Sequence, residues 1–561
     1  MGKKRYKLKK IKNPMTKIGM MLFIIICGFL TYKYFFDYKK EIIKTKEMYI
    51  GSENFSERSK EVDEKYKEKE FVRGQKVKVY DKIIKLENDN IDYFEIKHDN
   101  KIYLINSKYL VNKKEEVVKE KRKYLRTSSV VYEDADSPNI SGFLKKGEEL
   151  NIIGFDTLNS DGSVDMYKIK KENFEGYIDS KYIVGTKELA ESKYEKIYNI
   201  HKDRKYYFEL YGGSTKNLDY YPYEKKEFEN NKLKAETKTY YLAGSKYILQ
   251  NIDEYIKIGK EYGATAFVVD IKDGALAYKS EISKKYSKRS YDTAMNTVEA
   301  YKTVIDKLNK AGFYTIGRIV LFNDKIFAND NPKDCIKTPN GTSTSWVSGF
   351  SRNAWEYNVK LALEAIDLFD FNEIQFDYVR FPEASFNWSK NNYNFENYYN
   401  EEKAEAIQNF LFYATDQIHK KETYVSIDVF GECSSEYVTA YGQYWPAISN
   451  IVDVVSSMPY TDHFDRNNSD YWTKPYNTML NWGRGAAARQ KEIETPAKVR
   501  TWITAYDTPY WNVTTVYGAN EIEQQVKGLV DAGLGYGFIT WNASSNINKY
   551  RQIGPAFSKE Y

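Results

Sequence analysis

The stretch that decides the fold reads EIQFDYVRFP and runs from Glu373 to Pro382. Its apolar and polar residues alternate, which predicts a β-strand that continues as far as Arg380. The strand would end by presenting Asp377, an arginine and a proline. A carboxylate at the C-terminal end of a strand is typical of the face on which barrel enzymes carry their chemistry. The alternative is a buried aspartate that caps a turn.

Eight short apolar runs follow one another from about residue 236, with helical patterns between them. Strands that alternate with amphipathic helices, such as residues 353–369, predict parallel βα units, and eight of them fit a (β/α)8 or TIM barrel. A doubly wound open sheet is the alternative, but Ala243-Gly244-Ser245 after the first strand is not a phosphate-binding fingerprint. The expected strands are Thr239–Leu242, Ala266–Lys272, Tyr314–Leu321, Glu373–Arg380, Tyr424–Phe430, Val454–Tyr460, Val499–Ala505 and Tyr536–Asn542.

Polar and aromatic residues stand at or just beyond the C-terminal ends of these strands. Asp270 and Lys272 are two residues apart, so we expect them on one face of the second strand. Gathered at one end of a barrel, such residues predict a cleft with carboxylates at its base and aromatic platforms around them, which suits a sugar. The others at strand ends are Arg318, Asp377, Asp428, Glu432, Tyr460, His463, Trp502 and Trp541.

Further motifs extend this pattern over most of residues 236–550. They are Asp270-Ile271-Lys272, Asn331-Pro332, Trp346, Trp355-Glu356-Tyr357-Asn358, Glu373–Pro382, Asp428-Val429-Phe430-Gly431, Gly442-Gln443, Met458-Pro459-Tyr460, Val499-Arg500-Thr501-Trp502 and Ile539-Thr540-Trp541-Asn542. Together they resemble a family of bacterial glycosyl hydrolases of (β/α)8 fold, distantly similar to the α-amylase-like barrels. One departure is Thr461-Asp462, which replaces a family Pro-Ser before His463. The resemblance implies a hydrolase of O-glycosyl bonds and leaves its substrate open.

Glycoside hydrolysis needs two carboxyl groups that flank one bond. Because neighbouring strands lie about 4.8 Å apart, carboxylates on the fourth and fifth strands can approach the roughly 5 Å separation of a retaining enzyme. We expect Asp377 to be the nucleophile. The acid is either Asp428, which fits the family pattern, or Glu432, which lies nearer the cleft mouth and is favoured by analogy with amylase-like barrels. The residues expected to bind the substrate are Asp270, Lys272, Arg318, Arg380, Tyr460, His463, Trp502 and Trp541.

The N-terminus predicts a membrane anchor. Residues 1–17 carry eight lysines and arginines and no acid, and subtracting these eight from the formal charge of +6 leaves −2 for the rest. The chain therefore has no basic footprint for nucleic acid. Residues 18–36 form an apolar stretch interrupted by Lys33 and followed by no signal-peptidase site. We expect one signal-anchor helix in the cell membrane, with the basic tail inside and everything after residue 37 outside the cell.

Metal and cofactor chemistry have little support in the sequence. The four histidines include no pair at ligand spacing, and Cys335 and Cys433 show no pairing signal. No Walker-type loop or Gly-x-Ser-x-Gly elbow occurs. We therefore expect no cofactor and no metal. This also disfavours a metal-dependent polysaccharide deacetylase, whereas a non-catalytic barrel that binds carbohydrate or scaffolds the cell wall stays open as the rival function.

Residues 74–111 and 147–184 repeat each other at a constant offset of 73. Their short alternating strands predict two small β-barrel modules, and the second resembles bacterial SH3-like modules, many of which are implicated in wall binding. A passive spacer is the alternative. The polysaccharide or peptidoglycan substrate would then lie within reach of the barrel. The expected parts are 1–17 tail, 18–36 anchor, 37–70 charged linker, 71–113 and 122–186 SH3-like modules, 187–235 linker or strap, and 236–561 barrel.

Overall fold

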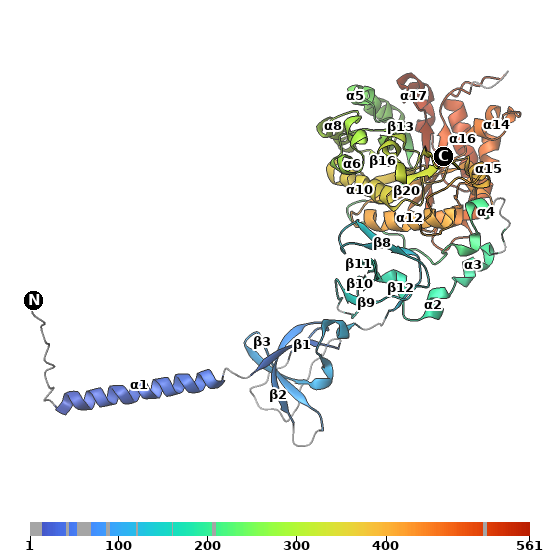
Figure 1. Cartoon of the computed structure of the whole chain (residues 1–561). Helices are drawn as coiled ribbons and strands as arrows, with labels where there is room; N and C mark the ends of the chain where they lie inside the picture. The colour runs from blue at the N-terminus through green and yellow to red at the C-terminus, as the bar shows by residue number, and fades with distance from the viewer. Residues whose placement is uncertain are drawn as a thin grey trace, which may run out of the picture. The chain divides into compact units, whose positions relative to one another are not determined.

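The computed structural model describes residues 14–40, 44–52, 69–85, 90–118, 122–159, 161–202, 204, 209–508 and 513–561. The first thirteen residues of the expected tail and most of the charged run 57–70 lie outside these ranges. The chain forms two compact units (Figure 1). The N-terminal unit is Met1–Arg122 with Ile153–Lys168, and the barrel unit is Lys123–Ile152 with Ile169–Tyr561.

The N-terminal unit begins with helix α1 (Pro14–Lys40), whose apolar side chains in the range 18–33 are exposed. Within the described ranges, no helix has the length and apolar character that a bilayer crossing requires. A five-stranded sheet follows in the order β4-β3-β2-β1-β5. Its strands are β1 (Thr45–Ile50), β2 (Lys76–Ile84), β3 (Tyr93–His98), β4 (Lys101–Asn106) and β5 (Leu110–Val111).

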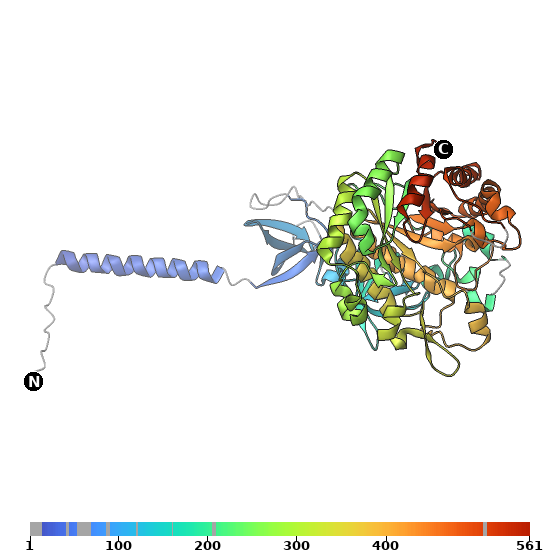
Figure 2. The same ribbon diagram turned by 90° about the horizontal axis from the view of Figure 1, so that it is seen from above.

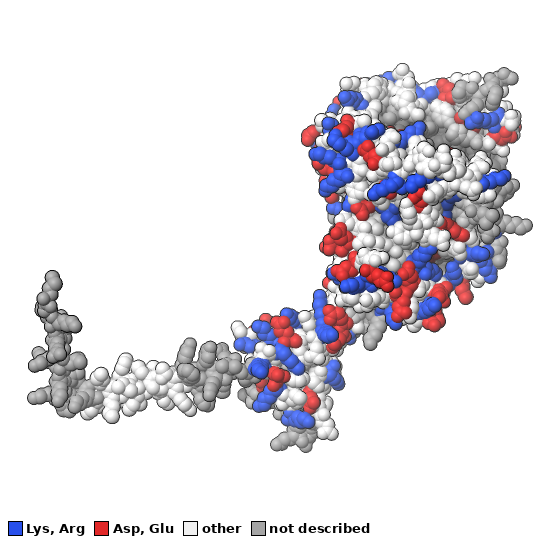
Figure 3. Space-filling model, viewed as in Figure 1, with Lys and Arg blue, Asp and Glu red and all other residues white. Residues whose placement is uncertain are grey.

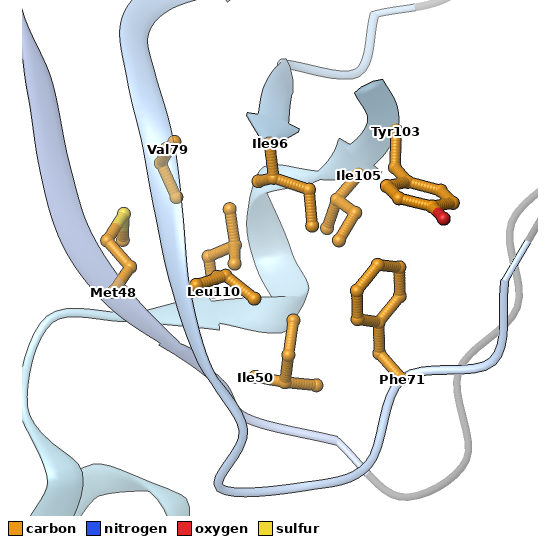
Figure 4. Packing of buried hydrophobic residues seen from close by; sticks show 9 residues of the cluster. Met48, Ile50, Phe71, Val79, Ile96, Tyr103, Ile105 and Leu110 are labelled. Atoms are coloured by element: carbon orange, nitrogen blue, oxygen red, sulfur yellow. The ribbon is translucent and has the colours of Figure 1, made fainter. Parts of the chain in front are cut away.

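Strand β1 was expected to be part of a linker, yet it pairs antiparallel with both β2 and β5. The first module therefore starts at Thr45 and not at residue 71. The reason is core packing, because Met48 and Ile50 of β1 are buried against Phe71, Ile96 and other apolar residues of the sheet (Figure 4). Removing this apolar surface from water stabilises a module that is otherwise rich in charge.

The 73-residue repeat is visible in the backbone. A 3-10 turn at Ser107–Tyr109 is capped by Asn106, whose side chain accepts from the N–H of Lys108. At the same offset, the turn Ser180–Tyr182 is capped by Asp179 in the same way, and the two caps share φ and ψ to within a few degrees. Gly74 and Gly147 match as well, with φ of 83° and 85°, a region that favours glycine. Local structure thus confirms the repeat, although it does not establish an SH3 fold.

The barrel unit is built on a parallel sheet in the order β22-β21-β20-β19-β16-β14-β13-β24-β23, in which β14 also pairs with the short β15. The strands form a nearly closed ring that fits the TIM-barrel fold. Each except the short β15 overlaps a strand that the sequence predicted, because strands buried on both faces read as apolar runs. They are β13 (Lys238–Leu242), β14 (Ala266–Asp273), β15 (Ala275–Leu276), β16 (Tyr314–Val320), β19 (Glu373–Asp377), β20 (Tyr424–Phe430), β21 (Val454–Met458), β22 (Lys498–Val499), β23 (Thr501–Thr504) and β24 (Phe538–Trp541).

Arg500 lies at the seam of this ring. It separates β22, which pairs with β21, from β23, which pairs with β24. Its backbone N–H donates to the carbonyl of Val455 at 3.0 Å, so one continuous segment contacts both neighbours. The Arg500 guanidinium forms an ion pair with Glu373 at 2.8 Å, and both side chains are fully buried. Tyr314 donates to the same carboxylate at 3.1 Å, which helps to satisfy the buried charge.

Helices surround the strands (Figures 1 and 2). Helix α10 starts with Ser351, which accepts from the N–H of Ala354, and its apolar face is buried as the spacing predicted. Positive and negative side chains are interspersed on the face of the barrel unit shown in Figure 3. The helices of the barrel are α5 (Lys246–Tyr262), α6 (Glu281–Tyr286), α7 (Lys288–Asp292), α8 (Val298–Lys310), α9 (Lys325–Asp330), α10 (Arg352–Phe369), α11 (Ser385–Lys390), α12 (Lys403–His419), α13 (Trp445–Ser449), α14 (Asp470–Thr473), α15 (Pro475–Gln490), α16 (Ala519–Asp531) and α17 (Ile547–Ile553).

Part of the second module packs directly on α12 within the barrel unit. Its strands there are β6 (Tyr124–Leu125), β7 (Ser129–Tyr132), β8 (Ile140–Leu144), β11 (Glu175–Asp179) and β12 (Ile183–Val184), while β9 (Ile152–Phe155) and β10 (Met166–Lys170) straddle the boundary between the units. Asp416 of α12 accepts from Lys181 at 2.6 Å and from the Tyr182 hydroxyl at 2.7 Å. The Tyr413 hydroxyl donates to the carbonyl of Pro138 at 2.7 Å.

Residues 187–235 form a strap on the barrel, the second of the two alternatives expected for them. They contain α2 (Lys187–Glu191), α3 (Glu195–His201) and α4 (Glu209–Gly212). Tyr223 of this segment donates to Asp416, so helix, module and strap share one carboxylate. Lys225 donates to the carbonyls of Ser449, Asn450 and Val452 at 2.7–3.1 Å. Burial lowers the pKa of Lys225 to about 7, which is the cost of placing an ammonium in this position.

Candidate active site

A cavity of about 360 Å³ opens where the barrel strands end. The side chains around it come from the ends of β14, β16, β19, β20, β21, β23 and β24 and from the loops that follow, as expected for the catalytic face of a TIM barrel. Its polar lining consists of Asp273, Arg318, Asn323, Asp377, Glu383 and His463. Its aromatic and apolar lining consists of Tyr378, Phe430, Met458, Tyr460, Trp502 and Trp541.

Arg318 is the centre of the charged part of this site. Its Nη1 lies 2.7 Å from Oδ1 of Asp270 and 3.2 Å from Oδ2 of Asp273. Its Nη2 lies 2.5 Å from Oδ2 of Asp377, and its Nε lies 3.6 Å from Oδ2 of Asp428. One guanidinium therefore serves four carboxyl groups, too few positive charges for all of them to be ionised at low cost.

The two most deeply buried of these carboxyl groups, Asp270 and Asp428, have raised pKa values. Burial raises the pKa of Asp270 to about 6, against the opposing effect of Arg318. Burial and then the negative charge of Asp377 raise the pKa of Asp428 well above its ordinary value. Trp502 donates its indole N–H to Oδ1 of Asp428 at 2.7 Å, while Oδ2 accepts no hydrogen bond from the residues that the structure describes. The low-dielectric surroundings therefore favour the protonated form of Asp428.

Asp377 is the last residue of β19 and lines the cavity. The strand was expected to continue to Arg380, but it ends here because Tyr378 has a φ of 54°. A tyrosine in this left-handed region is uncommon and costs free energy. The turn brings the N–H of Tyr378 to 2.6 Å from Oδ1 of Asp377. Register places Phe376 beside Ile427, so Asp377 and Asp428 follow at the same level on neighbouring strands.

Aromatic rings form one wall of the cavity. Trp541 lies edge-on to Trp502 at 5.6 Å between ring centroids and nearly parallel to Tyr460 at 6.3 Å. The His463 ring packs on the edge of Tyr460 at 5.2 Å. The expected aromatic residues are thus brought together with the strand-end carboxylates. Such faces are suited to the apolar side of a sugar ring.

Glu432 lines an adjoining cavity of about 590 Å³. The two cavities share the wall residues Phe430, Met458, Tyr460 and His463. Glu432 is exposed, and its two carboxylate oxygens accept from the hydroxyls of Tyr437 at 3.0 Å and Tyr441 at 2.7 Å. Of the two acids considered from the sequence, Glu432 therefore faces open space, whereas the Asp428 side chain is fully buried.

Three predicted binding residues, Asp270, Lys272 and Arg380, do not line the cavity. Asp270 and Lys272 do not share a face, because a β-bulge between them shifts the pairing of β14 with β16. The bulge directs Lys272 to Asp324 at 2.6 Å and to the ring of Tyr357 on α10. Arg380 is buried behind the cavity wall, where its guanidinium stacks on Phe430 at 4.1 Å. It also pairs with Glu383 at 2.9 Å.

Several lining residues were not predicted. Asp273 is the last residue of β14, one beyond the predicted end of that strand, Asn323 follows β16, and Glu383 comes directly after the proline of the opening motif. Their signal in the sequence is position, since each lies just beyond a strand end that was already marked. Tyr378 lies inside the motif itself, but its exposure in the cavity depends on its left-handed backbone conformation. The sequence pattern does not predict that conformation.

Comparisons with known proteins find one family model and several solved structures that are similar to parts of the chain. A family model described as "Putative glycosyl hydrolase domain" matches residues 239–547, and no curated protein matches the chain. A hypothetical protein from Ruminiclostridium thermocellum ATCC 27405 is 27% identical over 34% of this chain and 96% of its own, with a TM-score of 0.28. The PgaB (BpsB) glycoside hydrolase domain from Bordetella bronchiseptica is 11% identical over 56% and 98%, with a TM-score of 0.41. The catalytic domain of β-amylase from Paenibacillus polymyxa is 10% identical over 58% and 100%, with a TM-score of 0.38.

The family match covers more than half of the chain and includes all but the first residue of the ring of strands. It also includes Asp377, Asp428, Glu432 and the aromatic wall. The chain therefore belongs to this family of glycosyl hydrolase domains.

Proposed function

We propose that the chain hydrolyses a glycosidic bond of a cell-wall or surface polysaccharide, with Asp377 as the catalytic carboxylate. One observation carries the proposal. Asp377 lines the cavity at a strand end, is paired with Arg318 at 2.5 Å, and lies beside aromatic rings that can seat a sugar. Behind it lies Asp428, whose pKa is raised by burial and which therefore favours its protonated form.

In the first step, Asp377 attacks the anomeric carbon and forms a glycosyl ester, while the bond to the leaving oxygen breaks. Glu432 donates a proton to that oxygen. Geometry favours it over Asp428, because a fully buried side chain cannot contact the leaving group. In the second step, water attacks the anomeric carbon, gives its proton to Glu432 and releases Asp377. Asp428 acts through Asp377 as a positioning residue.

The test is a screen of the full chain against wall polysaccharides and α- and β-glucans. Asp377→Asn keeps the shape of the side chain, so we expect an unchanged melting temperature. The turnover number should fall by a factor of roughly 10⁴ or more. Asp367→Asn is the matched control, because its exposed carboxylate pairs with Lys421 and lies outside the cavity lining. A substrate on which Asp377→Asn retains a normal rate would make a binding role the better interpretation.

Glu432→Gln separates the acid from a bystander. The acid matters less when the leaving group is good, so this variant should be rescued on aryl glycosides of low leaving-group pKa and stay slow on the polymer. Equal losses on both kinds of substrate would remove Glu432 from the role.

Helix α1 anchors the chain in the cell membrane in this proposal, with the barrel outside the cell. The support is the exposure of apolar side chains along residues 18–33, such as Phe23 and Ile24, after a basic tail. Cell fractionation of the full chain and of a variant lacking residues 1–37 tests it. We expect only the full chain in the membrane fraction, and recovery of both in the soluble fraction would contradict the anchor.

The repeated β-modules bring the barrel to the wall in the same proposal, supported by their shared turn geometry and by the resemblance to SH3-like modules. A chain lacking residues 44–118 should sediment less with insoluble peptidoglycan than the full chain. Unchanged sedimentation would leave the first module as a spacer.

A further inference from the structure

We propose that the cavity beside Asp377 selects a saccharide that carries a free amine, an amino sugar in its cationic form, and that Asp273 and Glu383 recognise the ammonium. This inference rests on the proposed function, because it assigns the substrate class of the same site. It adds two specificity residues to which no role in catalysis has been given.

The charges around the cavity are unbalanced toward the negative. Arg318 and Arg380 are the guanidiniums at or behind its walls. Against them stand Asp273, Asp377 and Glu383 in the lining and Asp270 and Asp428 beneath it. Even with a proton on Asp428, four carboxyl groups face two guanidiniums.

Among the described residues that line this cavity there is no lysine, and Arg466 lines only the adjoining cavity. Lys272 is turned away from the cavity and is neutralised by Asp324 at 2.6 Å. His463 contributes an imidazole to the wall. Asp462, next to it in the chain, adds another carboxylate, which accepts from the Tyr506 hydroxyl at 2.7 Å. A cationic ligand would relieve this local excess of negative charge.

Asp273 and Glu383 are placed to meet such a ligand. Their side chains are 45% and 59% exposed, in contrast to the buried carboxyl groups of Asp270 and Asp428. Asp273 lies 3.2 Å from the same Nη1 of Arg318 that Asp270 approaches to 2.7 Å, so Arg318 keeps a closer partner if Asp273 turns to a ligand. Glu383 lies in the loop that follows β19, whereas Asp273 lies at the end of β14, so the two carboxylates line the cavity from different strands.

The aromatic lining favours the same ligand. Tyr378, Tyr460 and Trp541 are among the aromatic residues that line the walls. An aromatic face attracts an ammonium as well as the apolar side of a sugar ring. A carboxylate-bearing sugar, such as a uronic acid or a lactyl ether, would instead meet like charge, and N-acetylation would remove the charge that is recognised.

Binding to the full chain tests the inference. The probes are the methyl glycosides and the β-1,4-linked hexamers of glucosamine, N-acetylglucosamine and glucose, which differ only at the 2-position. Titration calorimetry should show the glucosamine compounds binding at least about tenfold tighter than both others, a factor that corresponds to a modest ion-pair contribution. The preference should shrink as salt is raised, because exposed charges are screened.

The variants locate the effect. Asp273→Asn and Glu383→Gln should each weaken binding of the glucosamine probes by about three- to tenfold, as expected for partly exposed carboxylates, and leave the neutral probes unchanged. Asp367→Asn removes an exposed carboxylate outside the cavity and should change the affinity neither for the glucosamine probes nor for the neutral probes. Equal binding of the three sugars, binding of none of them, or an amine preference that survives the Asp273→Asn/Glu383→Gln double variant would overturn the inference.

Failure of the inference can be told apart from failure of the proposed function. Hydrolysis that requires Asp377 but ignores the 2-amino group refutes the amine recognition alone. An amine preference that depends on Asp273 and Glu383, with hydrolysis unaffected by Asp377→Asn, supports the recognition and refutes the catalytic assignment.

Discussion

The indole N–H of Trp502 donates to Oδ1 of Asp428 at 2.7 Å, although β21 separates the strands of the two residues in the ring. A residue of β23 thus fixes a carboxyl group on β20 across the inside of the barrel. Both side chains are buried, so neither can replace this hydrogen bond with one to solvent.

Trp502→Phe should lower the free energy of unfolding by about 1–3 kcal/mol, because it leaves a buried oxygen of Asp428 without a donor. Urea unfolding measures the change. Trp388→Phe is the control, since this partly exposed indole of α11 stacks on Tyr393 and takes no part in the site. An unchanged unfolding free energy at Trp502 would show that the hydrogen bond contributes nothing.

Asp428→Asn should flatten the dependence of stability on pH. The folded chain keeps a proton on Asp428 to a higher pH than the unfolded chain, because burial raises the folded pKa, whereas the unfolded chain releases that proton near the ordinary pKa of about 3.9. The wild-type chain therefore loses stability as pH rises above 4 toward that folded pKa. Asparagine cannot titrate, yet it offers Oδ1 to Trp502. Melting temperatures from pH 4 to 7 should fall less in the variant, and equal slopes would contradict the assignment.

Glu373→Gln should destabilise the barrel by about 3–5 kcal/mol, because it strands the buried Arg500 charge. The double variant Glu373→Gln/Arg500→Met should recover part of this loss. Asp367→Asn, which breaks an exposed ion pair with Lys421, should change the unfolding free energy by about 1 kcal/mol or less. An equally small effect of Glu373→Gln and Asp367→Asn would mean that the buried Glu373–Arg500 ion pair does not stabilise the segment that closes the ring.

Tyr378→Gly should be more stable than Tyr378→Ala by about 1 kcal/mol, since a φ of 54° costs alanine but not glycine. Both variants lose the ring, so their difference isolates the backbone. At Tyr247 in α5, where the helix is exposed, the same two substitutions should rank in the opposite order. Thermal melting of the four variants decides, and the same order at both sites would be evidence against strain at Tyr378.

Residues 122–561 should unfold cooperatively, whereas residues 236–561 should melt earlier or aggregate. The shorter fragment loses Lys181, Tyr182 and Tyr223, which all donate to Asp416 of α12. It would also expose the apolar surface that these segments cover. Calorimetry of both fragments checks this, and equal melting temperatures would show that module and strap are dispensable.

The strands of the barrel could be predicted because a strand that is buried on both faces consists of a continuous run of apolar residues of strand length. The repeat could be predicted too, since its capped turns need the same residue types at Asn106 and Asp179. Most strand-end residues converge for the same reason: parallel strands leave their C-terminal ends on one side. Arg318, Asp377, Trp502 and Trp541 therefore met as expected.

The rest depends on long-range or backbone effects that residue patterns do not encode. The bulge before Lys272 changes the direction of its side chain, and the left-handed backbone at Tyr378 changes the direction of the chain. Neither change alters the order of apolar and polar residues from which the strands were predicted. The choice between Asp428 and Glu432 needed their burial, which follows from the packing of β20 and not from its sequence. The pairing of β1 was hidden because the charged run 57–70 separates it from the rest of its sheet.

The seam at Arg500 has a consequence for solubility. Were the segment 498–504 to detach, β21 and β24 would become sheet edges, with rows of free backbone N–H and C=O groups. Such edges are templates on which a second chain can add a strand. Glu373, by holding Arg500 in place, would then protect the protein from self-association in the cell as well as from unfolding, and the first sign of damage at this pair would be aggregates.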